Sequence, residues 1–296
     1  MLNNSTQFKQ PRHALIIGGS LGGLLVGNVL RSIGWNVSIY ERSTSNLYKR
    51  GAGIVLQPQV RELYDSLGLP FEDLTIASKN LVKYDPLGNR ISQEEATQVQ
   101  TSWSFMYKSL RDNFPDEHYH QGKALTHIKQ NGQRVTAFFQ DGTHAEGDLL
   151  IGADGSRSTV RWLMAAANQP EYAGYIAWRG MLNHEVMPEE ARELLFDFAS
   201  STNVQSHILG YSIPNSDSGA YNWVWYRPID EQYELQDLMT DLSGREYAYA
   251  IPPGTLSDKW LDRMHADAAQ LLPPSFRAAV QATPKPFAQA ILDLTS

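Results

Sequence analysis

The feature that most constrains this chain is a glycine-rich turn near its beginning, flanked by two apolar runs. Residues 14–17 form a short, partly β-branched run that stops at Gly18, which is typical of a buried parallel strand. A helical stretch follows at residues 24–33, and a second strand-like run spans residues 37–40. Strand, glycine turn, helix and strand are the parts of a dinucleotide-binding βαβ unit. The sequence therefore predicts an α/β chain that begins with a Rossmann-type nucleotide-binding domain.

The turn itself is suited to hold a pyrophosphate, and we expect contacts from Gly18, Gly19, Ser20, Leu21 and Gly22. Gly18 allows a tight turn, and Gly23 lets the helix pack closely on the strand. The N-terminus of the helix offers unpaired N–H groups and the positive end of a dipole. Ser20 departs from the pattern, because a glycine usually stands there, but its hydroxyl can donate to a phosphate oxygen. The alternative is a glycine-rich turn that binds no ligand.

Glu41 ends the second strand, 23 positions after Gly18. A carboxylate at this place accepts hydrogen bonds from the hydroxyl groups of the adenosine ribose. Its charge also disfavours a 2′-phosphate, so the predicted site suits FAD or NAD better than NADP.

The composition excludes several other classes of function. The net charge is −7 and no Lys/Arg-rich run is present, so the electrostatic signature of a nucleic-acid-binding or membrane-surface protein is missing. The chain has no cysteine, which excludes disulfides, a thiolate nucleophile and a cysteine-ligated metal. His118 and His120 form the only close histidine pair, but no third ligand is spaced with them, and we expect no metal.

The beginning of the chain has some features of a targeting signal. Lys9 and Arg12 precede an apolar run at residues 14–30, as in a secretory signal peptide. Five glycines interrupt this run, and a second strand rather than a cleavage site follows it. The run is also short for a membrane span. We therefore expect a cytoplasmic protein.

A second motif lies where a strand at residues 147–151 enters the segment Gly152-Ala153-Asp154-Gly155-Ser156-Arg157-Ser158. This segment resembles the Asp-Gly signature of the flavoprotein aromatic hydroxylases, the p-hydroxybenzoate hydroxylase superfamily. The resemblance implies that Asp154 and Gly155 lie near the FAD pyrophosphate. Ser158 is also a typical N-cap for a following helix.

Further segments are similar to the same family. The run from Arg50 to Gly53, with Gln57, resembles the loop whose backbone passes close to the isoalloxazine ring of FAD. Trp103 stands where an arginine that touches FAD usually opens a helix, which leaves two basic residues of that helix as substitutes. The resemblance thus implies cofactor contacts from Arg42, Arg50, Gln57, Lys108, Arg111 and Leu125.

The resemblance runs from about residue 12 to the end of the chain, and residues 172–180, 209–214 and 222–227 place it nearest to the 2,6-dihydroxypyridine 3-monooxygenase-like enzymes. It implies an inserted, mainly antiparallel β-sheet substrate domain over the flavin. The expected FAD-binding domain comprises residues 10–78 and 104–169, with residues 263–296 returning to it. The expected substrate domain comprises residues 79–103 and 170–262. A second Gly-Asp segment of the family is absent, so the resemblance implies a truncated hydroxylase.

His207 and Tyr211 are the candidate catalytic residues. They are four residues apart on an expected strand, so they share one face. Histidine titrates near neutrality and can take a proton from a ring hydroxyl. The alternative is that His207 is an ordinary residue of the sheet.

The function implied by the resemblance is hydroxylation of an electron-rich aromatic or hydroxypyridine-type substrate. In this family NADH or NADPH reduces FAD, which reacts with O2 to give a flavin hydroperoxide that transfers oxygen to the ring. The expected partners are a small aromatic substrate and O2, without nucleic acid or membrane, and a homodimer is one expectation for the assembly. Two alternatives remain: an incomplete or regulatory nucleotide-binding protein of the same fold, and an FAD-dependent halogenase or reductase.

Overall fold

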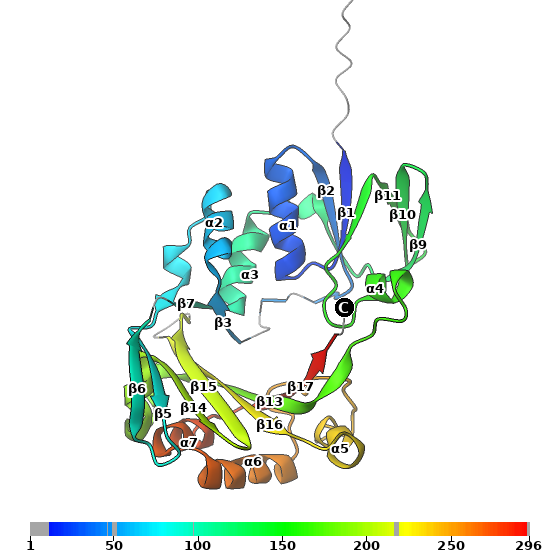
Figure 1. Ribbon diagram of the computed structural model, residues 1–296. Coiled ribbons are helices and arrows are strands. Elements are labelled where there is room, and N and C mark those ends of the chain that lie inside the picture. Colours follow the sequence, from blue (N-terminus) through cyan, green and yellow to red (C-terminus); the bar gives the residue numbers. More distant parts are fainter. Residues whose placement is uncertain (1–11, 46, 49–51, 97, 216–218, 295–296) are drawn as a thin grey trace, which may run out of the picture.

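The computed structural model describes residues 12–45, 47–48, 52–96, 98–215 and 219–294, which form two stacked layers (Figure 1). The upper layer in Figure 1 holds a parallel sheet with its helices, and the lower layer holds a large, mainly antiparallel sheet. Arg50 and Gly51, which the sequence places near the flavin, lie outside the described residues.

A four-stranded parallel sheet forms the centre of the upper layer, in the order β12-β1-β2-β8. Its strands are β1 (His13–Ile17), β2 (Asn36–Glu41), β8 (Tyr119–Gln121) and β12 (Leu149–Gly152), and helices α1 (Leu21–Ser32) and α3 (Trp103–Asp112) cover one face. Ala14 and Ile16 of β1 pack on the helix side, whereas Leu15 and Ile17 pack on the opposite side. Because both faces are covered, β1 is apolar without alternation, as a buried parallel strand should be.

A three-stranded antiparallel sheet covers the opposite face of the parallel sheet. It consists of β9 (Leu125–Asn131), β10 (Arg134–Phe139) and β11 (His144–Gly147). The predicted hairpin turn at residues 140–143 is confirmed, since Gly142 has φ +83° and Asp141 accepts a hydrogen bond from Thr143 N at 3.0 Å. After β12, the short helix α4 (Thr159–Met164) leads toward the lower layer.

A small antiparallel sheet lies where the two layers meet (Figure 1). Its strands are β3 (Gly53–Leu56), β7 (Val99–Ser102) and β4 (Ile76–Ala77), in the order β3-β7-β4. Helix α2 (Pro58–Ser66) follows β3, and short 3₁₀ turns span Glu72–Leu74 and Asp116–His118. The small sheet therefore places β3 against the upper face of the large sheet.

A seven-stranded sheet forms the lower layer, in the order β17-β13-β16-β15-β14-β5-β6. Its strands are β5 (Asn80–Tyr84), β6 (Arg90–Glu95), β13 (Glu171–Asn183), β14 (Phe198–Asn203), β15 (Ser206–Ile213), β16 (Ala220–Pro228) and β17 (Phe287–Asp293). All neighbouring strands are antiparallel except β14 and β5. The connections contain 3₁₀ turns (His184–Val186, Glu189–Phe196), a π-helical turn (Glu231–Leu235) and α5 (Gln236–Leu238).

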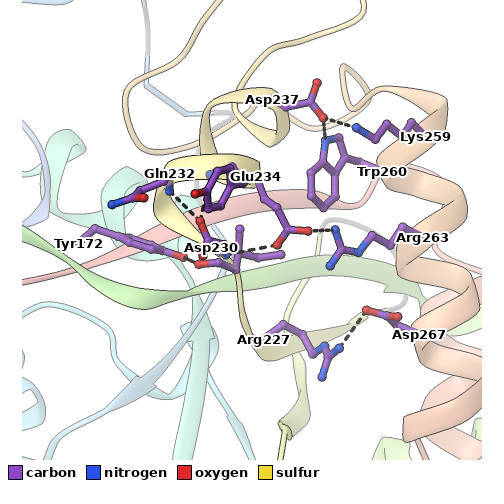
Figure 2. A network of polar contacts seen from close by, with 12 residues as sticks. Tyr172, Arg227, Asp230, Gln232, Glu234, Asp237, Lys259, Trp260, Arg263 and Asp267 are labelled. Atoms are coloured by element: carbon purple, nitrogen blue, oxygen red, sulfur yellow. Dashed lines mark hydrogen bonds and ion pairs between the residues drawn. The ribbon is translucent and has the colours of Figure 1, made fainter.

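Helices α6 (Asp258–Leu271) and α7 (Pro274–Gln281) cover the lower face of this sheet, where four tryptophans are buried: Trp178, Trp223, Trp225 and Trp260. Ion pairs and hydrogen bonds join α6 to β16 and to the π-helical turn that follows β16 (Figure 2). Arg227 of β16 pairs with Asp267 at 3.0 Å, and Arg263 pairs with Glu234 at 2.5 Å. The lower face of the large sheet thus packs against α6 and α7, and its upper face is turned toward the nucleotide-binding part.

The predicted fold class, a Rossmann-type α/β domain with an inserted and mainly antiparallel sheet, is confirmed. Residues 263–296 differ from the expectation, because α7 and β17 belong to the lower layer and do not return to the parallel sheet. The small side chains of Ala288 and Ala290 allow β17 to pack beside Trp178 in the lower core. The expected domain boundaries otherwise stay a prediction. Within the described part of the chain, no helix is long and apolar enough to cross a membrane.

Candidate functional site

A cleft of about 1190 Å³ opens at the carboxyl ends of β1, β2 and β12. Ligands of open α/β sheets bind at this edge, because strand ends and helix N-termini meet there. The upper layer lines the cleft with the glycine turn, the end of β2 and the residues after it, the residues that lead into β9, Trp103 of α3, and the Asp-Gly segment after β12. Gln289 of β17 lines it from the lower layer. The cleft therefore lies between the nucleotide-binding part and the large sheet.

The glycine turn has the close backbone approaches that its sequence predicts. Gly18 has φ +108°, and a Cβ there would lie 2.3 Å from the Ala153 oxygen. A Cβ at Gly23 would lie 1.9 Å from the Gly18 oxygen, so no side chain fits between helix and strand. Ser20 is the N-cap residue of α1, but its hydroxyl makes no capping hydrogen bond, and it lines the cleft together with Gly22. The first turn of α1 thus presents its N–H groups to the cleft.

Glu41 lies buried at the end of β2 and is held by two backbone N–H groups. Its Oε2 accepts from Gly19 N at 2.8 Å, and its Oε1 accepts from Ser43 N at 2.8 Å. A carboxylate has about four lone-pair directions, so two remain for hydroxyl donors such as those of a ribose. The two backbone bonds therefore fix the orientation of the carboxylate at the wall of the cleft.

Tyr119 of β8 is a site-forming residue that the sequence analysis missed. Its buried hydroxyl donates to the Gly19 oxygen at 2.7 Å, and a Cβ at Gly19 would lie 2.3 Å from that hydroxyl oxygen. Burial and the neighbouring Tyr107 hydroxyl raise the pKa of Tyr119, so the donor stays protonated. Both backbone groups of Gly19 are thus hydrogen-bonded, the N–H to Glu41 and the carbonyl oxygen to Tyr119. No local pattern marks Tyr119, because β8 joins the sheet from a distant part of the chain.

The Asp-Gly segment forms a capped turn at the opposite wall of the cleft. Asp154 accepts hydrogen bonds from the Ser158 hydroxyl at 2.5 Å and from Thr159 N at 2.6 Å. Ser158 in turn accepts from Arg161 N at 2.9 Å, so the predicted N-cap is confirmed. Gly155 has φ +79° and lines the cleft. The carboxylate of Asp154 therefore shapes the turn, and the backbone of the turn faces the cleft.

The candidate cofactor residues divide into two sets by position. Those that line the cleft are Gly18, Ser20, Gly22, Glu41, Arg42, Leu125, Asp154 and Gly155. Those that do not line it are Gly19, Leu21, Gln57, Lys108 and Arg111. Lys108 pairs with Asp112, Arg111 pairs with Asp116 at 2.6 Å, and Gln57 is exposed at the start of α2. Their roles in cofactor binding stay predictions, and Arg50 lies outside the described residues.

Trp103 and Lys123 are among the residues that line the cleft without having been assigned to it from the sequence. Trp103, noted above only as a departure from the family pattern, stacks on Tyr107 at 4.8 Å between ring centroids. Lys123 lies two residues before the start of β9 and forms an ion pair with Asp141 at 2.5 Å. Among the residues that the structure describes, no group of three His, Asp or Glu side chains is arranged to hold a metal ion.

His207 and Tyr211 share the upper face of the large sheet, as their spacing predicts. The His207 Nδ1 lies 2.7 Å from the Thr202 hydroxyl, and its ring stacks on Tyr226; burial lowers the pKa of His207. Tyr211 is buried and stacks on Phe198, and burial raises its pKa to about 12. Neither residue lines the cleft itself, and a catalytic role for either stays a prediction.

Gly53 of β3 contacts this upper face of the large sheet directly. A Cβ at Gly53 would lie 2.7 Å from both Tyr211 and Asn222, so the glycine is needed for contact with the large sheet. Its N–H donates to the Asn222 Oδ1 at 2.9 Å. The close approach of this glycine to the flavin ring, which the resemblance implies, stays a prediction; the structure shows its close approach to the large sheet.

Comparisons with known proteins agree with this geometry. The family described as FAD binding domain-like matches residues 172–293. The 2,6-dihydroxypyridine 3-monooxygenase of Paenarthrobacter nicotinovorans is 32% identical over 95% of this chain and 71% of its own length. The 6-hydroxynicotinate 3-monooxygenase of Pseudomonas fluorescens is 28% identical over 82% of this chain and 65% of its own length. The chain thus spans about two thirds of the length of these two relatives.

A solved structure is similar as a whole. The 2,6-dihydroxypyridine-3-hydroxylase from Arthrobacter nicotinovorans superposes with a TM-score of 0.90 and 31% identity, over 96% of this chain and 73% of that one. The agreement covers both layers and therefore the cleft between them. Fold, cleft and sequence identity together show that this chain belongs to the FAD-dependent aromatic hydroxylases.

Proposed function

We propose that this protein binds FAD in the cleft and hydroxylates an electron-rich heteroaromatic ring with NADH or NADPH and O2. The observation that carries the proposal is the position of the cleft. One wall has the parts of a dinucleotide site, and the other belongs to a sheet whose upper face holds buried polar and aromatic side chains. The named activities of the similar proteins, on 2,6-dihydroxypyridine and 6-hydroxynicotinate, support the same class of substrate.

The residues of the cleft fit the parts of FAD. Glu41, with two lone pairs left over, suits the ribose hydroxyls, and Arg42 beside it lines the same wall. Gly22 leaves open space where a side chain would stand, and the Ser20 hydroxyl makes no capping bond, so both suit a pyrophosphate at the helix N-terminus. The volume of about 1190 Å³ is larger than that of most small-molecule sites, as a dinucleotide requires.

FAD, when bound, supplies the redox chemistry, in which NAD(P)H, H⁺, O2 and the aromatic substrate give NAD(P)⁺, water and the hydroxylated product. The protein's own contribution is to hold the ring in place and to exclude water. The large sheet is suited to this, since Tyr211 and Asn222 on its upper face are almost fully buried under β3. Tyr211, with a pKa of about 12, serves as a neutral hydrogen-bond donor at pH 7.

The experiment combines cofactor retention with isotope transfer. Purified protein is mixed with excess FAD, freed of unbound flavin and examined by visible absorption. It is then supplied with NADH or NADPH, ¹⁸O2 and a panel that includes 2,6-dihydroxypyridine and 6-hydroxynicotinate. Retained flavin and a product carrying one ¹⁸O atom are the expected results. Retained flavin with oxidation of NAD(P)H but no ¹⁸O in any product identifies a reductase or oxidase, and a colourless protein contradicts FAD binding by this chain.

A further inference from the structure

Arg179 of β13 is a partly buried cation with no partner in the described part of the chain. Its neighbours Trp178 and Gly180 face the lower core, so Arg179 points to the upper face. It takes part in no ion pair of the described residues, and its Nε is buried without a hydrogen-bond acceptor. A buried N–H of a charged group is normally hydrogen-bonded, and the Nε of Arg179 is not. An arginine held in this way therefore points to an acceptor that the described residues do not supply.

Among the described residues, the strands beside Arg179 place no carboxylate near it on this face. The strand register places Val224 of β16 directly beside Arg179 and Leu209 of β15 directly beside Val224, so that these three residues form one row across the sheet. The neighbouring rows hold Ala177, Tyr226 and His207 on one side and Met181, Asn222 and Tyr211 on the other. None of these side chains carries a negative charge at neutral pH. The positive charge is therefore uncompensated across the middle of the sheet.

Asn222 adds a second unsatisfied donor beside Arg179. The side chain is fully buried, and its Oδ1 accepts the Gly53 N–H at 2.9 Å. That bond assigns the other amide atom as Nδ2, which is buried without a partner. A buried donor without an acceptor is costly, so its presence needs an explanation. Asn222 lies one strand and one row away from Arg179, within the reach of a single small ligand.

This pair of donors lies next to the cofactor cleft. Ala177, two residues before Arg179, is paired with Gln289 of β17, and Gln289 lines the cleft. Tyr211 lies on the other side, in the row of Asn222, and is close enough to Arg179 for that charge to oppose the burial that raises the pKa of Tyr211. Arg179, Asn222 and Tyr211 are thus three donors on one face; Arg179 can only donate, the Asn222 Oδ1 already accepts the Gly53 N–H, and the neutral Tyr211 hydroxyl can donate or accept.

We propose that Arg179 and Asn222 form an oxyanion site that binds a negatively charged oxygen of the heteroaromatic substrate, so that the enzyme selects the ionised form of its substrate. The proposal rests on the proposed hydroxylase function and names the chemistry that its substrate must carry. The charged oxygen belongs either to a deprotonated ring hydroxyl or to a carboxylate on the ring. Arginine forms charge-assisted hydrogen bonds with both, and the amide N–H of Asn222 adds a directed donor.

The test is ligand binding to the FAD-loaded protein without NAD(P)H, so that no turnover takes place. Dissociation constants are measured by calorimetry for 2,6-dihydroxypyridine, which has ionisable ring oxygens, 6-hydroxynicotinate, which has a carboxylate, and uncharged 2,6-dimethoxypyridine. The wild type is expected to bind at least one of the two acids more tightly than the neutral compound, with affinity increasing as that acid ionises. Which acid binds more tightly shows whether the oxygen belongs to the ring or to a carboxylate.

Three variants locate the site. Arg179→Met keeps the length of the side chain and is expected to weaken the anions roughly 10- to 100-fold, with the neutral compound within about twofold. Arg179→Lys is expected to recover part of the loss. Asn222→Asp keeps the acceptor for Gly53 but exchanges the donor for a charge, and is expected to weaken the anions at least as strongly. Arg134→Gln removes an exposed arginine that pairs with Asp148 far from the cleft, and is expected to leave binding unchanged.

Thermal unfolding separates this role from a structural one. Because Arg179 has no partner in the described chain, Arg179→Met is expected to unfold at the same temperature as the wild type or higher. The proposal is overturned if Arg179→Met binds the ionised ligands as tightly as the wild type, or if the wild type does not prefer either anion to the neutral compound. Failure of the hydroxylase proposal is recognised separately, by the absence of flavin retention or of ¹⁸O transfer in the wild type.

Discussion

Replacing Glu41 by glutamine tests how the nucleotide site is built. The carboxylate accepts one backbone N–H on each oxygen, from Gly19 and from Ser43, both at 2.8 Å. Glutamine is close to glutamate in shape but has one oxygen and one NH2 group. In either orientation, one backbone N–H therefore faces the NH2 group and loses its acceptor.

The magnitude follows from the buried position of Glu41. A hydrogen bond to a charged group in the interior contributes about 1.5–3 kcal/mol, so the free energy of unfolding is expected to fall by that amount. A chain of 296 residues unfolds with an entropy of roughly 0.6 kcal/mol per kelvin. The unfolding temperature of the protein without FAD is therefore expected to fall by about 2–5 °C. FAD retention is expected to decrease as well, because the wall that we propose as the ribose site loses its geometry.

The assay is differential scanning calorimetry of the protein without FAD, followed by titration with FAD. Glu146→Gln is the matched control, since it makes the same change of charge at an exposed position of β11. It is expected to leave both the unfolding temperature and the FAD affinity unchanged. The reasoning is refuted if Glu41→Gln unfolds within 1 °C of this control (about 0.6 kcal/mol) and binds FAD equally well.

Three further substitutions test other parts of the structure. Gly23→Ala places a methyl group 1.9 Å from the Gly18 oxygen and is expected to cost more than about 2 kcal/mol and to abolish FAD retention; a stable, yellow variant would contradict this. Trp223→Phe removes the indole bond to Thr283 at 2.8 Å and leaves a void, so the unfolding free energy should fall by about 2–4 kcal/mol in chemical denaturation, and an unchanged midpoint would refute it. Burial lowers the pKa of His120, so the folded chain takes up this proton less readily than the unfolded chain, and stability is lost as the pH falls below about 6.5. His120→Gln should therefore show a smaller difference in unfolding temperature between pH 7.5 and pH 5.5, and an unchanged difference would exclude His120 as a source.

Part of the candidate site follows from local sequence alone. The turn at Gly18 and Gly23 needs residues without a Cβ, and Asp154 with Ser158 caps a helix only a few residues away. Such requirements act within a short segment, so the residue types themselves mark the turn and the cap. The sequence also predicted correctly that His207 and Tyr211 share a face, because alternation along a strand is a local property.

Other parts of the site depend on contacts between distant segments. Tyr119 holds Gly19 across 100 residues, and Asn222 holds Gly53 across 169. Lys108 and Arg111 are basic and near Trp103 in sequence, but helical geometry turns them to Asp112 and Asp116 outside the cleft. Sequence spacing does not decide such partners, because each depends on how two separately formed elements pack.

The sequence by itself determined that this chain has a Rossmann-type nucleotide fold, with Glu41 and the Asp154-Gly155 turn as parts of the site, because strand, turn and cap are encoded within short windows. Only the tertiary structure decided that β17 joins the large sheet and that Arg179, on the upper face of this sheet, has no partner among the described residues. The physical reason is that strand order and side-chain burial arise from long-range packing, in which a residue's environment is made by chain segments far from it in sequence.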